Sequence, residues 1–375
     1  MIDHAATPSP DRPLATSDDA TSPVTRAPRT ARLPRLSIGS APVSHSSSRS
    51  LLLAMFGIPL LIMLAIASFA WPAARMAPRD LPLGLVGPGQ ATDPLAAALS
   101  ARGFAVHRYD SDAAARAAIE DRDLYGALML APDGLTLLTA SAASPVVAQL
   151  LQQAISGQLA VNPTQPAPPL TVVDVVPADA DDPRGAVLGA SVMPLVLAGI
   201  VLGAVMALIA PPGWRQHGGL IGTALLVGLA VTLVVQSWLG AIGGNWWLNA
   251  GVLSLIVLAI AAVVAGAIVL FGLAGAPIAS ALMLFVGNPW SGVTAAPELL
   301  PSWVGITGQL LPPGVGGTLL RSTAFFDGAG FASPLLVLVI WTAIGLTTLW
   351  AAAIWRVGDR TDPLPDLAAR PVTFR

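Results

Sequence analysis

Residues 216–297 read QHGGL IGTALLVGLA VTLVVQSWLG AIGGNWWLNA GVLSLIVLAI AAVVAGAIVL FGLAGAPIAS ALMLFVGNPW SGVTAAP, a stretch without any Asp, Glu, Lys or Arg. Water-soluble domains place charged side chains on their exposed surface. A charge at the middle of a membrane helix costs about 2.5–3.5 kcal/mol on insertion scales. The stretch therefore predicts a polytopic α-helical membrane protein in which lipid, rather than water, surrounds this part of the chain.

The composition of the whole chain agrees with that prediction and excludes several kinds of chemistry. The 375 residues are 54% hydrophobic and 11% charged, and the net charge of −2 gives no indication of a nucleic-acid partner. The sequence has no Cys, which excludes disulfides and thiolate metal sites. It also has no Lys, so the chain cannot supply the P-loop lysine that contacts nucleotide phosphates.

The N-terminal part combines a polar tail with an apolar run. Residues 1–48 are rich in Pro, Ser, Thr and Ala, which predicts a disordered cytoplasmic tail. Its Arg residues either only set the topology or also bind anionic lipid; they are Arg26, Arg29, Arg32, Arg35 and Arg49. Residues 51–71 form the first predicted transmembrane helix. A cleaved signal peptide is disfavoured because the run is long and begins far into the chain.

Residues 75–184 differ in kind, because charges return and strand-like runs alternate with helix-like runs. This alternation predicts a small α/β domain with a mainly parallel sheet. The expected strands are 81–87, 104–109, 124–130, 135–139 and 170–176, and the expected helices are 94–102, 112–121 and 145–159. The domain lies between the first and second predicted spans, so we expect it to be extracytoplasmic.

Residues 186–357 predict a five-helix transmembrane domain, which brings the total to six transmembrane helices. The expected spans are 186–210, 219–241, 250–271, 277–286 and 334–355. An even number of spans places both termini in the cytoplasm, including a second tail at 358–375. Arg-rich flanks then fall on the inner side of the cell membrane, as the positive-inside rule requires.

The segment 288–333 is neither a clean span nor an ordinary polar loop, since it carries five Pro residues among apolar ones. We interpret it as a re-entrant hairpin buried against protein at membrane depth. Its polar residues are candidates to line an exit path or to hold it shut, unless they sit in ordinary outward-facing turns: Glu298, Gln309, Arg321 and Asp327. The polar break between the second and third spans is a candidate cytoplasmic coupling loop, with Trp214, Arg215 and His217.

No pattern in the sequence predicts an enzyme, a cofactor or a metal site. The four His residues are scattered and show no ligand spacing. The charge-free stretch lacks the ionisable groups that ion-driven carriers and intramembrane hydrolases use. Gln236 is interpreted as a helix–helix hydrogen-bonding residue or an interfacial one. The pair Gly199 and Gly203 favours close helix packing, with a subunit interface as an additional role.

The order of these segments resembles the ABC-2-type exporter permeases, especially those related to the phage-infection-protein-like membrane proteins. The resemblance covers roughly residues 50–357 and rests on the layout together with several motifs: 124–134 (LYGALMLAPDG), 287–292 (GNPWSG), 297–301 (PELLP), 309–314 (QLLPPG), 320–322 (LRS) and 325–328 (FFDG). It implies a separate nucleotide-binding ATPase subunit and a homodimer or paired permease. The implied contact surfaces are the segment before Leu51 and the loop 211–217.

Two functions from different classes follow. The first is the permease subunit of an ATP-driven exporter that moves a hydrophobic or amphipathic substrate. The alternative is a non-transporting membrane scaffold or surface receptor that works through its extracytoplasmic domain. Neither hypothesis requires a cofactor, and neither identifies the substrate.

Overall fold

A computed structural model describes residues 48–131, 134–159 and 170–358. The predicted tails at 1–48 and 358–375 lie outside the described residues, except for Ser48 and Gly358. By its contacts the chain divides into two units after Ala54, and the description below concerns the unit from Met55 onward. Helix α1 (Ser48–Ala74) crosses the boundary between these units.

Five helical stretches of the described chain are long and apolar enough to cross a membrane. Four of them are α1, α5 (Ala186–Ile209), α6 (Trp214–Thr232) with its π-helical continuation η1 (Leu233–Trp238), and α11 (Ala332–Gly358). The fifth begins with α7 (Trp246–Phe271) and continues to Gly287. The chain is thus a membrane protein with several apolar helices, as the sequence predicted.

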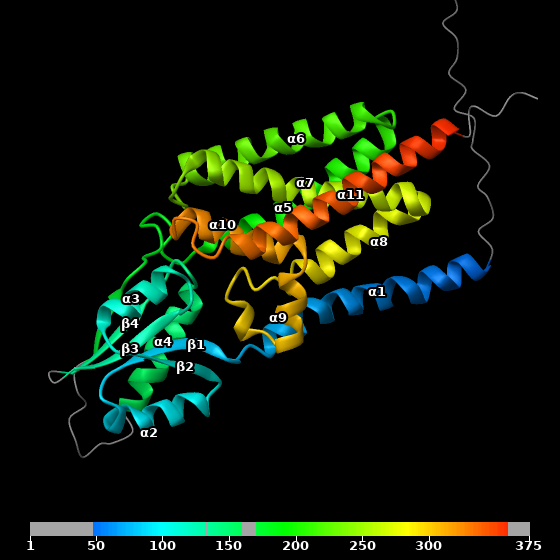
Figure 1. Cartoon of the computed structure of the whole chain (residues 1–375). Coiled ribbons are helices and arrows are strands. Elements are labelled where there is room, and N and C mark those ends of the chain that lie inside the picture. Colours follow the sequence, from blue (N-terminus) through cyan, green and yellow to red (C-terminus); the bar gives the residue numbers. More distant parts are fainter. Residues whose placement is uncertain (1–47, 132–133, 160–169, 359–375) are drawn as a thin grey trace, which may run out of the picture. The chain divides into compact units, whose positions relative to one another are not determined.

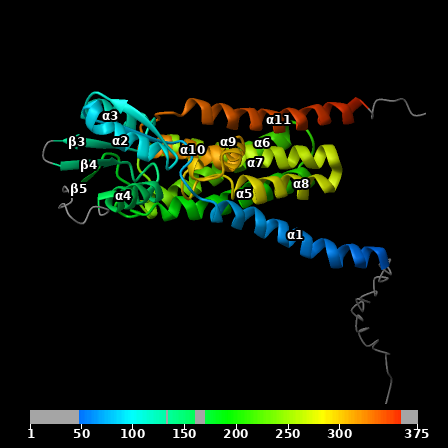
Figure 2. The ribbon, with the colours of Figure 1, turned by 90° about the horizontal axis from the view of Figure 1, so that it is seen from below.

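The six predicted spans are not confirmed, because the predicted fourth and fifth spans belong to one long helical stretch. Gly272 has a φ of +65°, which glycine adopts readily, and it ends α7. The chain then turns back through η2 (Gly272–Ala274), α8 (Gly275–Ala281) and π-helical η3 (Leu282–Gly287). Figures 1 and 2 show α8 beside α7. Together α8 and η3 have 13 residues and reach about 20 Å, less than a membrane core of about 30 Å.

Helix α7 packs against α5, α6 and α11 (Figure 1). Its close contact with α5 depends on the predicted small-residue pair. A Cβ atom at Gly199 would lie 2.7 Å from the Ile260 side chain, and one at Gly203 would lie 2.4 Å from the Ala261 carbonyl oxygen. The pair therefore serves helix packing inside the chain.

The α/β domain has a five-stranded sheet in the order β2-β1-β3-β4-β5. Only β3 and β4 pair antiparallel, so the prediction of a mainly parallel sheet is confirmed. The strands are β1 (Leu81–Val86), β2 (Phe104–Tyr109), β3 (Gly126–Ala131), β4 (Gly134–Thr139) and β5 (Leu170–Asp174). The helices are α2 (Gly89–Ser100), α3 (Asp112–Glu120) and α4 (Pro145–Leu159). Helix α2 begins five residues before its predicted start, so Pro94 lies inside it.

The sheet is covered on both faces, and each core also receives residues from the segment after α8. Helices α2 and α4 pack on one face, where Ala295, Ala296 and Leu299 join the core. Helix α3 packs on the other face, together with Phe326. These shared cores connect the α/β domain to the predicted hairpin by apolar burial, at about 25 cal/mol for each Å² removed from water.

The predicted hairpin contains three short helices, η4 (Pro297–Leu299), α9 (Ser302–Gln309) and α10 (Pro312–Phe325). Helix α10 is almost wholly buried, and α9 lies against the chain that precedes it. A Cβ atom at Gly308 would lie 1.7 Å from the Trp290 carbonyl oxygen, so only glycine allows this approach. Trp303 of α9 also packs between Trp71 and Trp290, with ring centroids 5.6 and 5.1 Å away.

We expect Gly308→Ala to lower the thermal stability of the detergent-solubilised protein, by an amount typical of overpacking, about 1–3 kcal/mol. The matched control is Gly222→Ala in α6, where nothing lies within 4 Å of the added Cβ atom. Alanine is the better helix former, so that control should be neutral or slightly stabilising. Equal unfolding temperatures for the two variants would contradict the tight contact.

Candidate functional site

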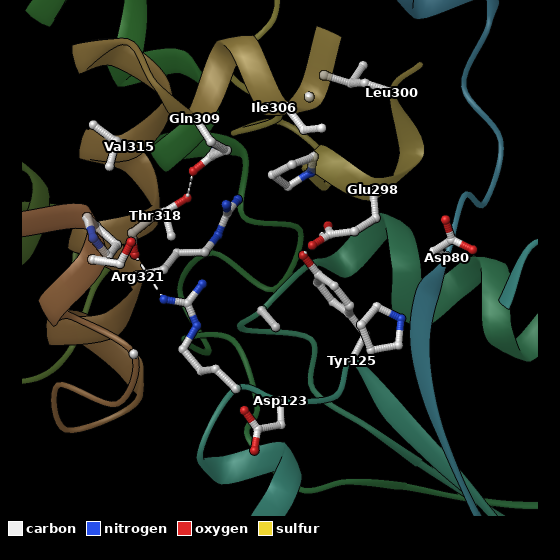
Figure 3. A pocket seen from close by; sticks show the side chains of 18 of the residues that line it. Asp80, Asp123, Tyr125, Glu298, Leu300, Ile306, Gln309, Val315, Thr318 and Arg321 are labelled. Atoms are coloured by element: carbon white, nitrogen blue, oxygen red, sulfur yellow. Dashed lines mark hydrogen bonds between the residues drawn. The ribbon is translucent and has the colours of Figure 1, made fainter. Parts of the chain in front are cut away.

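A cavity of about 710 Å³ lies between the α/β domain and the segment after α8. The α/β domain and the segment between α1 and β1 contribute charged and aromatic residues: Arg79, Asp80, Asp121, Arg122, Asp123 and Tyr125. The segment after α8 contributes Glu298, Gln309, Thr318 and Arg321. Figure 3 shows Glu298 and Tyr125 pointing toward one another, with Arg321 reaching into the cavity from α10.

Arg122 reaches the cavity because of the way α3 ends. The Asp123 N–H donates to the Ala118 carbonyl at 2.9 Å, and the Arg122 N–H donates to the Ile119 carbonyl at 3.1 Å. This pair of bonds is a Schellman motif, whose left-handed position usually holds glycine. Arg122 occupies it with a φ of +66°. The strain of a side chain there is of order 1–3 kcal/mol and is typical of functional positions.

The Arg122 guanidinium fastens the α/β domain to α10. Its Nη1 donates to the Thr318 carbonyl at 2.9 Å and also to the Ser322 hydroxyl. The same cation lies 5.2 Å from the centre of the Phe326 ring, within cation–π range. Burial lowers the pKa of Arg122, while Tyr125 and Glu298 act in the opposite direction.

Arg321 is the most buried charge of the cavity, with 6% of its surface exposed. Its Nη2 donates to the Val293 carbonyl. Burial lowers the pKa of Arg321 to about 10, so the side chain stays cationic at neutral pH. Arg321 lies in α10, outside the five candidate spans. Burying a charge without a paired counter-charge costs several kcal/mol in proteins, so this position is expensive for the fold.

Tyr125 and Glu298 join the two sides of the cavity directly. The Tyr125 hydroxyl donates to Glu298 Oε2 at 2.7 Å. Burial, together with the charge and the hydrogen bond of Glu298, raises the pKa of Tyr125 well above its usual range. The phenol therefore remains a neutral donor. Nearby, the Arg79 backbone N–H donates to the Glu298 carbonyl at 3.0 Å, which ties the segment between α1 and β1 to η4.

Gln309 is fixed by two hydrogen bonds within the predicted hairpin. Its Nε2 donates to the Ser291 carbonyl at 2.8 Å, and its Oε1 accepts from the Thr318 hydroxyl at 2.8 Å. Both polar ends of the amide are thereby satisfied by protein groups. Gln309 thus shapes the cavity wall, with one amide N–H and its carbonyl oxygen held by protein groups.

The structure brings three of the four predicted hairpin residues to the cavity, namely Glu298, Gln309 and Arg321. Asp327 does not line it and sits in a left-handed turn after α10, with a φ of +50°. Sequence reasoning missed Arg79, Asp80, Arg122 and Tyr125. The only local signal was the alternation of charges in Asp121-Arg122-Asp123, which is also typical of a solvated loop.

The three residues of the predicted coupling loop lie at the start of α6. Trp214 is 73% exposed, and the Arg215 guanidinium lies 5.6 Å from its ring centre. His217 instead ties α6 to α11, because Nε2 lies 3.1 Å from the Leu346 carbonyl oxygen and the ring contacts Trp350 edge-on. None of the three residues lines the cavity.

The described residues contain no group of three His, Cys, Asp or Glu side chains able to hold a metal ion. Comparison of the chain with family models, curated proteins and solved structures found no match. The fold and the site therefore define the class of the protein: a helical membrane protein with a charged cavity between its α/β domain and the short helices η4, α9 and α10.

We expect an ultraviolet pH titration to find Tyr125 protonated near pH 10, where an exposed phenol is half ionised. Tyr109 is the chain's other tyrosine, so Tyr109→Phe isolates the signal. Because the folded pKa of Tyr125 is raised, its contribution to stability is complete below pH about 10 and is lost at higher pH. Adding Glu298→Gln should lower the pH of ionisation, since it removes a neighbouring negative charge. Tyrosinate formation near pH 10 in the folded Tyr109→Phe protein would contradict the burial.

We expect Arg122→Ala to speed amide hydrogen exchange in the last two turns of α10, because Thr318, Ser322 and Phe326 lose their common partner. Arg116→Ala is the matched control, since Arg116 pairs with Asp112 on its own helix at 2.8 Å and does not contact α10 in the described structure. Hydrogen exchange with mass spectrometry measures both. Equal protection of α10 in the two variants would show that Arg122 does not fasten it.

Proposed function

We propose that this protein is the permease subunit of an ATP-driven ABC-2-type exporter in the cell membrane, and that it moves a hydrophobic or amphipathic substrate. The observation that carries the proposal is the cavity, which joins charged groups to an apolar wall beside the membrane helices. Ligand sites of this kind are concave, mostly apolar and supplied with few polar groups. An amphipathic molecule matches both parts of such a lining.

The proposed topology has both termini in the cytoplasm and the α/β domain on the outer side. In it, α8 and η3 return the chain outward after α7, and the buried α10 precedes the last span. The Trp cluster of Trp71, Trp290 and Trp303 supports an outer boundary at this level, because tryptophan concentrates at membrane interfaces. The segment 288–333 then lies between the last span and the α/β domain as a re-entrant hairpin.

The chain has no Lys to form a P-loop, so in this proposal a separate ATPase subunit supplies the energy. The exposed Trp214 and Arg215 at the start of α6 form the proposed contact with that subunit. A second copy of the permease, or a paired permease, completes the transporter.

The test is reconstitution of the full chain in proteoliposomes with each P-loop protein encoded beside it. The expected result is ATP hydrolysis that increases in the presence of the permease, together with efflux of a fluorescent amphiphile. Failure of every partner to respond would contradict the exporter. A stable complex formed by the same chain without any ATP response would instead favour the membrane scaffold or receptor.

In that assay we expect Arg321→Gln to slow efflux by about tenfold or more, since a hydrogen bond to a charged group contributes about 1.5–3 kcal/mol. Expression should remain comparable. Arg108→Gln serves as the control, because Arg108 pairs with Asp93 on the domain surface and does not line the cavity. Equal efflux from the two variants would remove Arg321 from the transport path.

A further inference from the structure

Arg321 keeps donor groups that no described protein atom accepts. Nη2 donates to the Val293 carbonyl, and no bond from Nε or Nη1 to a described residue exists. These nitrogens are also not sealed from solvent, because the described side-chain atoms that are both buried and unpartnered belong to Asp112 and Trp290. A side chain that is 94% buried thus turns its remaining donors toward the cavity, as Figure 3 shows for Arg321.

Glu298 presents the opposite charge to the same space. Its Oε2 accepts from Tyr125, whereas Oε1 has no partner among the described residues and is not sealed. Glu298 and Arg321 make no ion pair with each other in the described structure, although both line the cavity. Two opposite charges therefore face one cavity without neutralising each other directly.

The other charged groups of the cavity refine the kind of ligand that fits. Arg79 donates to the carbonyls of Ala77, Leu299 and Arg75, and Arg122 holds α10. The lining as a whole has three Arg residues and four acidic residues. This acidic excess repels a ligand that carries only negative charge. A ligand with one positive and one negative group has no net charge, so it is not repelled overall.

One wall of the cavity is apolar and continues onto exposed surface. Leu300, Val315 and Val337 line it together with Ile306 of α9 and Leu310, which follows α9. Ile306 and Leu310 are 64% and 57% exposed, so this wall opens away from the charged groups. A hydrocarbon chain attached to the ligand could leave along α9 and remain in apolar surroundings.

We infer that the cavity binds the zwitterionic head group of an amphiphile, with its oxyanion, a phosphate or carboxylate, at Arg321 and its ammonium group at Glu298. The hydrocarbon tail lies along Ile306 and Leu310. This inference rests on the proposed permease and names the class of its substrate. Arg321 is suited to the oxyanion because guanidinium N–H groups match oxyanion geometry, and the acceptor Oε1 of Glu298 suits an ammonium donor.

Isothermal titration calorimetry of the full chain in nonionic detergent tests the inference with three probes. Dihexanoyl-phosphatidylethanolamine carries both charges and a tail, dihexanoyl-phosphatidylglycerol lacks the ammonium group, and free phosphoethanolamine lacks the tail. We expect the first to bind at least about tenfold more tightly than either of the others. Equal affinity for the glycerol lipid would overturn the zwitterion, and equal affinity for free phosphoethanolamine would overturn the amphiphile.

Two variants separate the charges in a way that misfolding could not imitate. Glu298→Gln should weaken the ethanolamine lipid about tenfold and leave the glycerol lipid unweakened. Arg321→Gln should weaken both lipids, and Arg321→Lys should partly restore them. The matched controls Arg108→Gln and Glu120→Gln should change neither affinity, since neither residue lines the cavity. Unchanged affinities in both cavity variants would overturn the inference.

The calorimetry needs no ATPase, so its outcome is distinct from that of the reconstitution. If the ethanolamine lipid does not bind but ATP-driven efflux of another amphiphile is observed, this inference is wrong and the proposed exporter is supported. If the ethanolamine lipid binds but no partner shows an ATP response, the head-group site is supported and the proposed exporter is contradicted.

Discussion

Burial of most of α7 is the constraint from which the remaining membrane helices take their positions. Such a helix must satisfy its polar side chains from protein, because neither lipid nor bulk water is available. Asn249 is fully buried, donates to Gln236 at 3.0 Å and to Gly243 at 2.8 Å, and accepts from the Thr323 hydroxyl at 2.8 Å. This satisfied network joins α7 to the end of α6 and to α10. Helix α10 is thereby held from the bundle side through Thr323, while Arg122 holds it from the α/β domain.

The segment from Trp290 to Phe326 consequently belongs to two packed bodies at once. Leu299 and Phe326 lie in the cores of the α/β domain, while Leu319 and Leu320 lie in the core of the membrane helices. A displacement of the domain would have to repack both cores or break the connections at Arg122 and Tyr125. Packed interfaces of this kind change between discrete arrangements more readily than they deform gradually. The cavity lies at that junction, so its shape depends on both bodies.

Local patterns in the sequence were sufficient for the elements but not for the site. Strand β2 and helix α4 begin and end at the predicted residues, since alternation and flanking polar residues are local signals. The number of spans was harder, because the turn at Gly272 joins α7 and α8 within one apolar stretch. Glu298 and Arg321 stood out as rare charges among apolar residues. Arg122 and Tyr125 did not, because their role depends on the left-handed end of α3 and on contacts with residues about 170–200 positions away.

The distribution of charge argues that the cavity is more than a by-product of packing. A chain with only 11% charged residues places seven charged side chains from separate segments around one space. Two of them, Asp80 and Arg122, hold positive φ angles, which are uncommon for residues other than glycine. A third, Arg321, is buried beside a carbonyl and forms no ion pair with a described acidic residue. Glycine at positions 80 and 122 would relieve the backbone strain, and an apolar residue at position 321 would remove the desolvation cost. The chain instead retains both the backbone strain and the desolvation cost in one cavity. This favours a role for these charges in binding a ligand rather than in stabilising the fold.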